Sequence, residues 1–442
     1  MRPLPPLVAA AALNLLATLA VPLYVVARVG PGAETDALFA SIVVPQLLVM
    51  IVAGSLIHVL VPLLAGRDPE GFGEDAWTFV VGVGGAYAAG AVVLYAAAPS
   101  WVPWAVPGFA PPTRALAVEL ARVHAVGMTF AAVVCVLMAA CHARRRFLRF
   151  EITSALASLA ALGVLAWGIP LYGVRAAAWA LVAKSVVQAA LLLPAAGAFR
   201  PPRWRGATLR EARRRILPLL AGRSYYRTGP VVDRFLASAA PAGGLSMLHL
   251  AEQMYAAGHF LLSRTVSAPM LPLLAEHARA GRWTEFRREA RARLGVVLAA
   301  TLLGLLVLGV AGRPVLSRLL EVGRMGSAEL DVLYWILLAL GGLWVGGAAG
   351  EVLASSFYAR GDTSTPTRVG TVGFTLGLVF KVVGFRYAGV VGLAVGTSAY
   401  SLLNAAVMAI LLLRAGPRGA TPPPRADLAP VPGEGPAAAS AT

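Results

Sequence analysis

Long apolar segments follow one another along almost the whole chain, and polar residues are concentrated in the short stretches between them. Each segment is about as long as the roughly 20-residue helix that crosses the hydrocarbon core of a bilayer. The segments do not alternate with period two, as the strands of a membrane barrel do. The pattern therefore predicts an all-α polytopic membrane protein of about twelve spans: 7–28, 37–65, 76–98, 117–140, 152–169, 172–197, 212–238, 243–275, 293–318, 330–357, 366–384 and 388–413.

Composition agrees with this pattern, and charge placement gives an orientation. Hydrophobic residues make up 58% of the chain and charged residues 13%, against about 25% charged in soluble proteins. The net charge of +17 could suggest nucleic acid, but its arginines crowd alternate connections, as the positive-inside rule requires. We therefore expect no nucleic-acid partner, a protein surrounded by membrane lipids, and both termini in the cytoplasm.

A basic stretch after the sixth span divides the chain. It predicts an N-terminal six-helix lobe over 1–198, a cytoplasmic basic connector over 199–215, a C-terminal six-helix lobe over 216–415 and a disordered tail over 416–442. An even number of spans in each half relates the halves by an axis along the membrane normal. Within the connector, Thr208 followed by Glu211 fits a capping box and predicts a short helix leading into span seven.

Span seven carries charges that need a reason to lie in a membrane. An arginine at mid-bilayer costs about 2.5–3.5 kcal/mol on insertion scales. On a straight helix Arg227 lies about 40° from Arg223, and Arg234 about 20° from it, so the three form one stripe. Pro230 predicts a bend within that stripe. We expect the stripe to face a central watery cavity and bind an anionic cargo, with phosphate as the natural partner of arginine.

Other polar residues extend this hypothesis. Asp233 and Glu252 are expected to tune or pair with the arginines, and Gln253 follows Glu252 in span eight. Two histidines of that span, His249 and His259, could couple to protons. The plainer interpretation is that Arg223 reaches toward an interface while Asp233 simply pairs with a nearby arginine.

Motifs for catalysis are absent from the sequence. It contains no G-x-S-x-G, no Walker A and no H-E-x-x-H. Cys135 and Cys141 are six residues apart in one span and suggest neither a disulfide nor a metal site. The sequence thus predicts a protein that is not an enzyme and uses no cofactor or metal.

Three blocks resemble one family. Residues 32–39 read GAETDALF and are followed by PQLL at 45–48; residues 233–252 open with DRFLAS and close with AE; residues 358–366 read YARGDTSTP. These blocks resemble the G-x-x-x-D-A-F-F…P-N-L-L, D-x-x-L-A-S…A-(D/E)-R and Y-A-x-x-D-T-x-T-P motifs of the MurJ (MviN) lipid II flippases. One departure is Gln253, which stands where the family motif has an arginine.

The resemblance implies a fold and an activity. It implies the multidrug/oligosaccharidyl-lipid/polysaccharide flippase superfamily, with two six-helix lobes around a central cavity and alternating access. It also implies outward movement of an undecaprenyl-pyrophosphate-linked precursor across the bacterial inner (plasma) membrane. Asp36 would hold the external gate, and Asp362 and Pro366 would serve the loop that matches the third motif.

The sequence therefore predicts a flippase for a lipid-linked anionic glycan precursor, lipid II or a related polysaccharide unit. Arg223, Arg227, Arg234, Glu252 and Gln253 would form the binding site, and H⁺ or Na⁺ is the possible coupling ion. Three alternatives stay open: an ion-coupled exporter of small molecules on the same fold, a membrane glycan ligase or polymerase, and a degenerate paralogue that does not transport. The short external loops near 99–116 and 312–329 speak against the ligase or polymerase.

Overall fold

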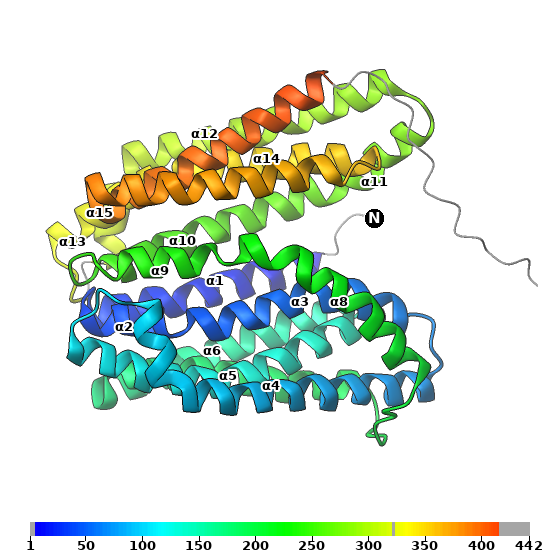
Figure 1. The fold of residues 1–442 in the computed structure, drawn as a ribbon, viewed down its shortest axis with the longest axis horizontal. Coiled ribbons are helices and arrows are strands. Elements are labelled where there is room, and N and C mark those ends of the chain that lie inside the picture. The colour runs from blue at the N-terminus through cyan, green and yellow to red at the C-terminus, as the bar shows by residue number, and fades with distance from the viewer. Residues whose placement is uncertain (1–4, 321–322, 415–442) are drawn as a thin grey trace, which may run out of the picture.

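The computed structural model describes residues 5–320 and 323–414, and helices joined by short turns account for nearly all of them. The predicted tail from 416 onward lies outside the described residues. The first half forms seven helices that pack together in the lower part of Figure 1: α1 (Pro5–Val29), α2 (Ala33–Ser41), α3 (Val43–Leu64), α4 (Pro69–Ala105), α5 (Pro111–Ala143), α6 (Phe147–Tyr172) and α7 (Val174–Leu192).

The second half lies mainly in the upper part of the same view, with α8 running down from α9 to the lower group (Figure 1). A short π-helical turn separates α10 from α11. The helices of this half are α8 (Ala207–Arg227), α9 (Gly229–Ala237), α10 (Gly244–Leu262), α11 (Ala268–Arg279), α12 (Trp283–Leu320), α13 (Ser327–Ala339), α14 (Gly341–Ala359) and α15 (Ser364–Arg414).

The helices reproduce the predicted spans. Nine described helical segments are long and apolar enough to cross a membrane, judged by length and composition. The longest, α15, changes direction at Ala388 and Gly389, whose backbone is not helical, and so contains two of the predicted spans. The two remaining spans correspond to α8–α9 and α10–α11, which are more polar. The all-α membrane fold with about twelve spans is thereby confirmed.

Span seven is interrupted, as its proline predicts. The first helix ends at Arg227, Thr228 lies between the two helices, and α9 begins at Gly229 with Pro230 in its first turn. Proline fits there because the first turn of a helix does not use its backbone N–H groups within the helix.

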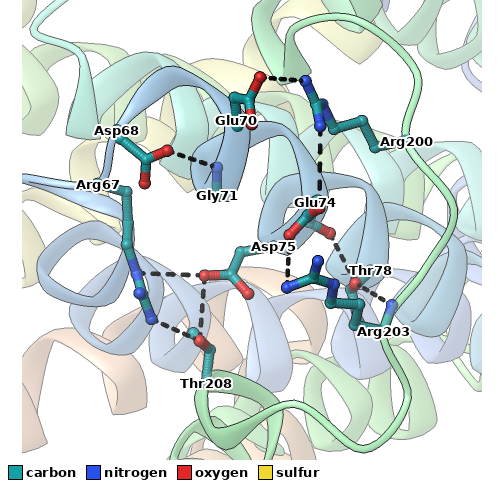
Figure 2. Close-up of polar contacts among 10 residues, drawn as sticks. All are labelled: Arg67, Asp68, Glu70, Gly71, Glu74, Asp75, Thr78, Arg200, Arg203 and Thr208. Atoms are coloured by element: carbon teal, nitrogen blue, oxygen red, sulfur yellow. Dashed lines mark hydrogen bonds and ion pairs between the residues drawn. The ribbon is translucent and has the colours of Figure 1, made fainter.

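The basic segment before α8 is anchored to the first half of the chain. Arg200 lies 3.1 Å from a carboxylate oxygen of Glu70, and Arg203 lies 2.9 Å from one of Glu74 (Figure 2). The start of α8 then buries Ala212 in the apolar core built by α3, α4, α5 and α7. The division into two lobes with a separate connector stays a prediction, and the connector is packed against the first half.

Thr208 does not cap a helix. The residue before α8 is Gly206, and no side chain caps that helix end. The Thr208 hydroxyl instead donates to Asp75 at 3.0 Å and accepts from Arg67 at 2.7 Å, while Arg67 and Asp75 form an ion pair at 3.3 Å (Figure 2). The capping-box prediction was wrong because two partners distant in sequence occupy the hydroxyl.

Asp362 closes the turn before α15. Its carboxylate accepts hydrogen bonds from the backbone N–H groups of Ser364 and Thr365, at 3.0 and 2.9 Å, and from both hydroxyls. Burial alone would raise the pKa of the Asp362 carboxyl, but the hydrogen bonds from Thr365 and Ser364 outweigh it and hold the pKa below its usual value. Pro366 lies buried in the first turn of α15, where a missing N–H costs nothing.

Replacing this cap should lower stability. We expect Asp362→Ala to cost about 1 kcal/mol, because two backbone N–H groups lose their acceptor. Since the folded-state pKa is lowered, the carboxylate's contribution is present above its unfolded pKa and disappears as the pH falls through the folded value. Thermal unfolding of the detergent-solubilised chain at neutral pH measures the loss. Asp362→Asn keeps an acceptor and should retain most of the stability; an equal loss in both variants would contradict the capping role.

Candidate functional site

A carboxylate from the first half of the chain binds the start of a helix from the second half. Asp36 on α2 accepts hydrogen bonds from the backbone N–H groups of Gly243 and Ser246, both at 2.7 Å. These groups open α10, whose N-terminus carries the positive end of the helix dipole. Thr35, next to Asp36, adds a hydroxyl contact to Ser246 at 3.3 Å. The two halves are therefore joined through a buried, charge-assisted contact.

Further contacts between the halves lie at the same end of the molecule, where α2 and α13 are labelled in Figure 1. The Gly108 N–H donates to the Ser238 hydroxyl at 3.1 Å, and the Arg324 N–H donates to the Ala27 carbonyl at 2.8 Å. A Cβ on Gly108 would come within 2.6 Å of the backbone at Ala239, so only glycine fits this approach. We call this end, with Asp36 at its centre, the closed end.

Two adjoining hollows lie between the halves, farther along α1 and α10. Their volumes are about 170 and 260 Å³, and both are lined by Thr18 of α1 and Gln253 of α10. The first lies next to the closed end, where the Phe39 ring stacks on His249 at 4.3 Å. The second extends toward the N-terminal part of α1. We call the two hollows together the central cavity, whose polar lining residues are Asn14, Thr18, Gln46, Lys184, His249 and Gln253.

Polar groups of the first half form a connected row beside the central cavity. Asn14 donates to the Glu151 carboxylate at 2.7 Å, and the Thr18 and Ser158 hydroxyls lie 3.2 Å apart. The Lys184 ammonium lies 3.4 Å from the Thr18 hydroxyl. Among the described residues that line the cavity, Lys184 is the one lysine or arginine. The cavity's cation therefore comes from α7.

The second half pairs its own charges beside the cavity. Arg234 on α9 is only 3% exposed and lies 2.8 Å from the Glu252 carboxylate on α10. Its guanidinium also lies 2.9 Å from Nδ1 of His249. Because a guanidinium only donates, Nδ1 of this histidine accepts and the ring is neutral. Arg234 is thus held between two partners and does not line the central cavity.

A second ion pair lies next to the first. The Lys381 ammonium on α15 lies 2.7 and 2.9 Å from the two carboxylate oxygens of Asp233, and both side chains are buried. A buried charge without a partner is strongly unfavourable, whereas a matched pair is tolerated. Asp233 and Arg234, neighbours in sequence, therefore join α9 to α15 and α10 respectively.

The expected arginine stripe is divided between two helices. Arg227 is half-buried at the end of α8, Arg234 is on α9 beyond the break at Thr228, and the side chain of Arg223 lies outside the described residues. Angles calculated for one straight helix do not hold across that break. Of the residues expected to bind substrate, Gln253 lines the central cavity, and Glu252 lies beside it, engaged with Arg234.

Sequence reasoning missed the first-half side of the cavity. Asn14 and Thr18 are four residues apart and share a helix face, which is a detectable but weak signal. Lys184 is visible as a lone lysine in an apolar span, but only the fold shows that it lies opposite Gln253. Within the described ranges, the structure brings together no group of three His, Cys, Asp or Glu side chains that could hold a metal ion.

These features define a class of protein: a polytopic helical membrane protein of the transporter type, with a polar cavity between two halves that are joined at the closed end and where α8 packs against the first half. Solved structures share this fold. An inward closed lipid II flippase MurJ has a TM-score of 0.81 at 16% identity, covering 92% of this chain and 87% of that one. An inward-facing MATE-family multidrug resistance transporter of the MOP superfamily has a TM-score of 0.72 at 16% identity, covering 91% and 94%.

The chain belongs to the lipid II flippase MurJ family, whose family model matches residues 25–425. It is 25% identical over 205 residues to the probable lipid II flippase MurJ of Vibrio cholerae, and 23% identical over 208 residues to that of Haemophilus influenzae. Each match covers 46% of this chain, and 39% and 41% of the relatives. The matched region thus spans about two fifths of the length of these relatives.

Removing the Asp36 charge should loosen the closed end. Asp36→Asn weakens two hydrogen bonds to an ionised acceptor, which contribute about 1.5–3 kcal/mol each. We expect a cysteine at Ala37, which is fully buried, to react at least about tenfold faster with a maleimide in the Asp36→Asn background. The rates are measured in membranes after the two native cysteines are replaced by serine.

Asp331 supplies the matched control. It is exposed and pairs with Arg313 at 2.7 Å within the second half alone. Asp331→Asn should leave the labelling rate unchanged. Equal rates in the Asp36→Asn variant and the parent would show that this carboxylate does not keep the end closed.

The Lys381–Asp233 pair should behave as a unit. Removing one partner leaves a buried charge, so Lys381→Met or Asp233→Asn alone should each cost about 3–5 kcal/mol. The double variant should be more stable than either single variant, because no charge is left unpaired. Thermal unfolding in detergent tests this expectation. Additive losses in the double variant would contradict a coupled pair.

Proposed function

We propose that this protein flips an anionic glycan precursor across the bacterial inner membrane. In this precursor the glycan is linked to undecaprenyl pyrophosphate. The observation that carries the proposal is the central cavity, which lies between the two halves and presents one ammonium group among uncharged hydrogen-bonding side chains. An anionic headgroup suits such a lining, because hydrogen bonds between ammonium and phosphate groups are charge-assisted. Membership of the lipid II flippase family supports the same cargo class.

The positions of the basic clusters support an orientation. The arginines at 144–149, 279–293 and 360 lie at helix ends opposite the closed end, on the side where α1 begins (Figure 1). By the positive-inside rule that side is cytoplasmic. Both termini are then cytoplasmic, Asp36 lies toward the outside, and the second hollow extends toward the cytoplasm. This arrangement suits the loading of a precursor made in the cytoplasm.

In this proposal, Lys184 binds the pyrophosphate, while Gln253, Asn14 and Thr18 supply hydrogen bonds to it or to the first sugar. Two further candidates are Arg223 and Arg227, near the C-terminal end of α8. They would attract the anionic headgroup toward the cavity. Arg234 positions α10 through Glu252 instead of meeting the cargo, because both of its described partners belong to the protein.

Transport would follow alternating access. The Asp36 contact holds the outer end closed, and its release would let the halves separate there while the inner ends approach. No nucleotide-binding motif occurs in the sequence, so membrane potential or a gradient of H⁺ or Na⁺ would drive the cycle. The same fold could export small molecules, and the functional test separates these cargoes.

Complementation tests this proposal. Expression in a strain depleted of its own peptidoglycan flippase should restore growth. Lys184→Met should abolish the rescue, because the cavity loses its cation, whereas Lys184→Arg should retain much of it. Membrane levels of each variant are compared by immunoblot.

Arg214→Gln is the control for loss of one positive charge, since Arg214 is exposed on α8. It should support growth fully. Failure of the well-expressed parent chain to rescue would rule out lipid II and favour a different cargo on this fold. Undiminished rescue by Lys184→Met would rule out the proposed headgroup site.

A further inference from the structure

A second basic site lies outside the central cavity, at the beginning of α12. Trp283, Arg287 and Arg291 are four residues apart, so they share one face of the helix. Together with Thr284 and Arg288 they line a surface hollow of about 610 Å³. Arg360, in the turn after α14, lies over the Trp283 ring at 5.7 Å. Four arginines from two segments thus surround one aromatic side chain.

An apolar slot leads inward from these arginines. It has a volume of about 160 Å³, shares Trp283, Arg287 and Arg291 with the surface hollow, and lies between α12, α14 and α15. Its walls away from the charges are aliphatic, and they include Leu294, Leu353 and Leu412. The site therefore has a cationic mouth and an apolar interior that runs toward the membrane-spanning parts of the same helices.

Two nearby carboxylates form ion pairs of their own, and a third, Glu285 in the first turn of α12, is a single carboxylate against the four arginines of the site. Glu289, on the same turns of α12, pairs with Arg293 at 2.7 Å, and Glu276 at the end of α11 pairs with Arg282 at 3.1 Å. Within the described residues, no ion pair joins Arg287 or Arg291 to a carboxylate. The cationic mouth thus keeps an excess of positive charge just before the apolar part of α12 begins.

We propose that this site binds an anionic phospholipid from the cytoplasmic leaflet, with its phosphate on Arg287 and Arg291 and part of an acyl chain in the apolar slot. Basic pockets between membrane helices on the cytoplasmic side suit anionic headgroups. Tryptophan prefers the membrane interface, where one side of its ring is apolar and the other is wet. Arginine forks match phosphate oxygens in geometry as well as charge. The site is separate from the proposed cargo cavity and does not depend on the cargo.

Native mass spectrometry of the full chain in detergent tests this proposal. The apparent Kd is measured for dioleoyl-phosphatidylglycerol and for dioleoyl-phosphatidylcholine, which has the same chains but no net charge. We expect phosphatidylglycerol to bind at least about tenfold more tightly. Arg287→Gln combined with Arg291→Gln should remove that preference, since two arginines near an anionic membrane surface together contribute more than about tenfold in affinity.

A charge-matched control comes from α8. Arg213 and Arg214 are both exposed, so Arg213→Gln with Arg214→Gln removes the same charge from another basic segment and should leave the preference unchanged. Ala409 lines the slot, and Ala409→Phe, which fills it but keeps the arginines, should also weaken binding. Thermal unfolding confirms that each variant remains folded.

Four results would overturn the proposal. One is equal affinity for the two lipids. The second is an undiminished preference in the double variant at α12, and the third is an equal loss in the control at α8. The fourth is displacement of phosphatidylglycerol by inorganic phosphate at equal concentration, which would show a site for a free anion and not for a lipid.

Discussion

A charge inside a bilayer must meet an opposite charge or a set of hydrogen bonds, and this constraint organises the second half of the molecule. Arg234 with Glu252 and Lys381 with Asp233 bring two positive and two negative groups together on three helices. The cluster is neutral overall, so its members can remain buried. Its charges fix α9, α10 and α15 relative to one another. The lysine that lines the central cavity among the described residues, Lys184, belongs to the first half.

The same constraint explains how the halves meet. Asp36 is buried, yet its carboxylate receives two short backbone hydrogen bonds at the positive end of α10. Such a contact is strong when formed and involves few atoms. Around this contact, buried apolar side chains of both halves form one continuous cluster, which includes Leu38 of the first half and Leu245 and Leu248 of the second. Opening this end would therefore break the Asp36 contact and also expose part of this shared apolar interface.

Sequence reasoning predicted the architecture well and the site less well. Apolar runs, Pro230 and the three motif blocks are local signals, and they predicted the spans, the break and the family respectively. Pairing between polar side chains is not local. Asp233 and Lys381 are 148 residues apart, and Thr208 and Asp75, which are hydrogen-bonded, are 133 residues apart. The predicted stripe of Arg223, Arg227 and Arg234 assumed one regular helix. The helix is interrupted at Thr228, so the predicted angles do not apply. Lys184 could be recognised as unusual, but its position opposite Gln253 follows from packing that no spacing shows.

The central claim is that Lys184 binds an anionic headgroup in the cavity between the halves. Direct binding tests it most simply, with undecaprenyl pyrophosphate added to the purified chain and bound complexes counted by native mass spectrometry. The account predicts clear binding to the parent chain, at least about tenfold weaker binding to Lys184→Met, and recovery in Lys184→Arg. Equal binding by the parent and Lys184→Met would contradict it, because the headgroup would then be held elsewhere.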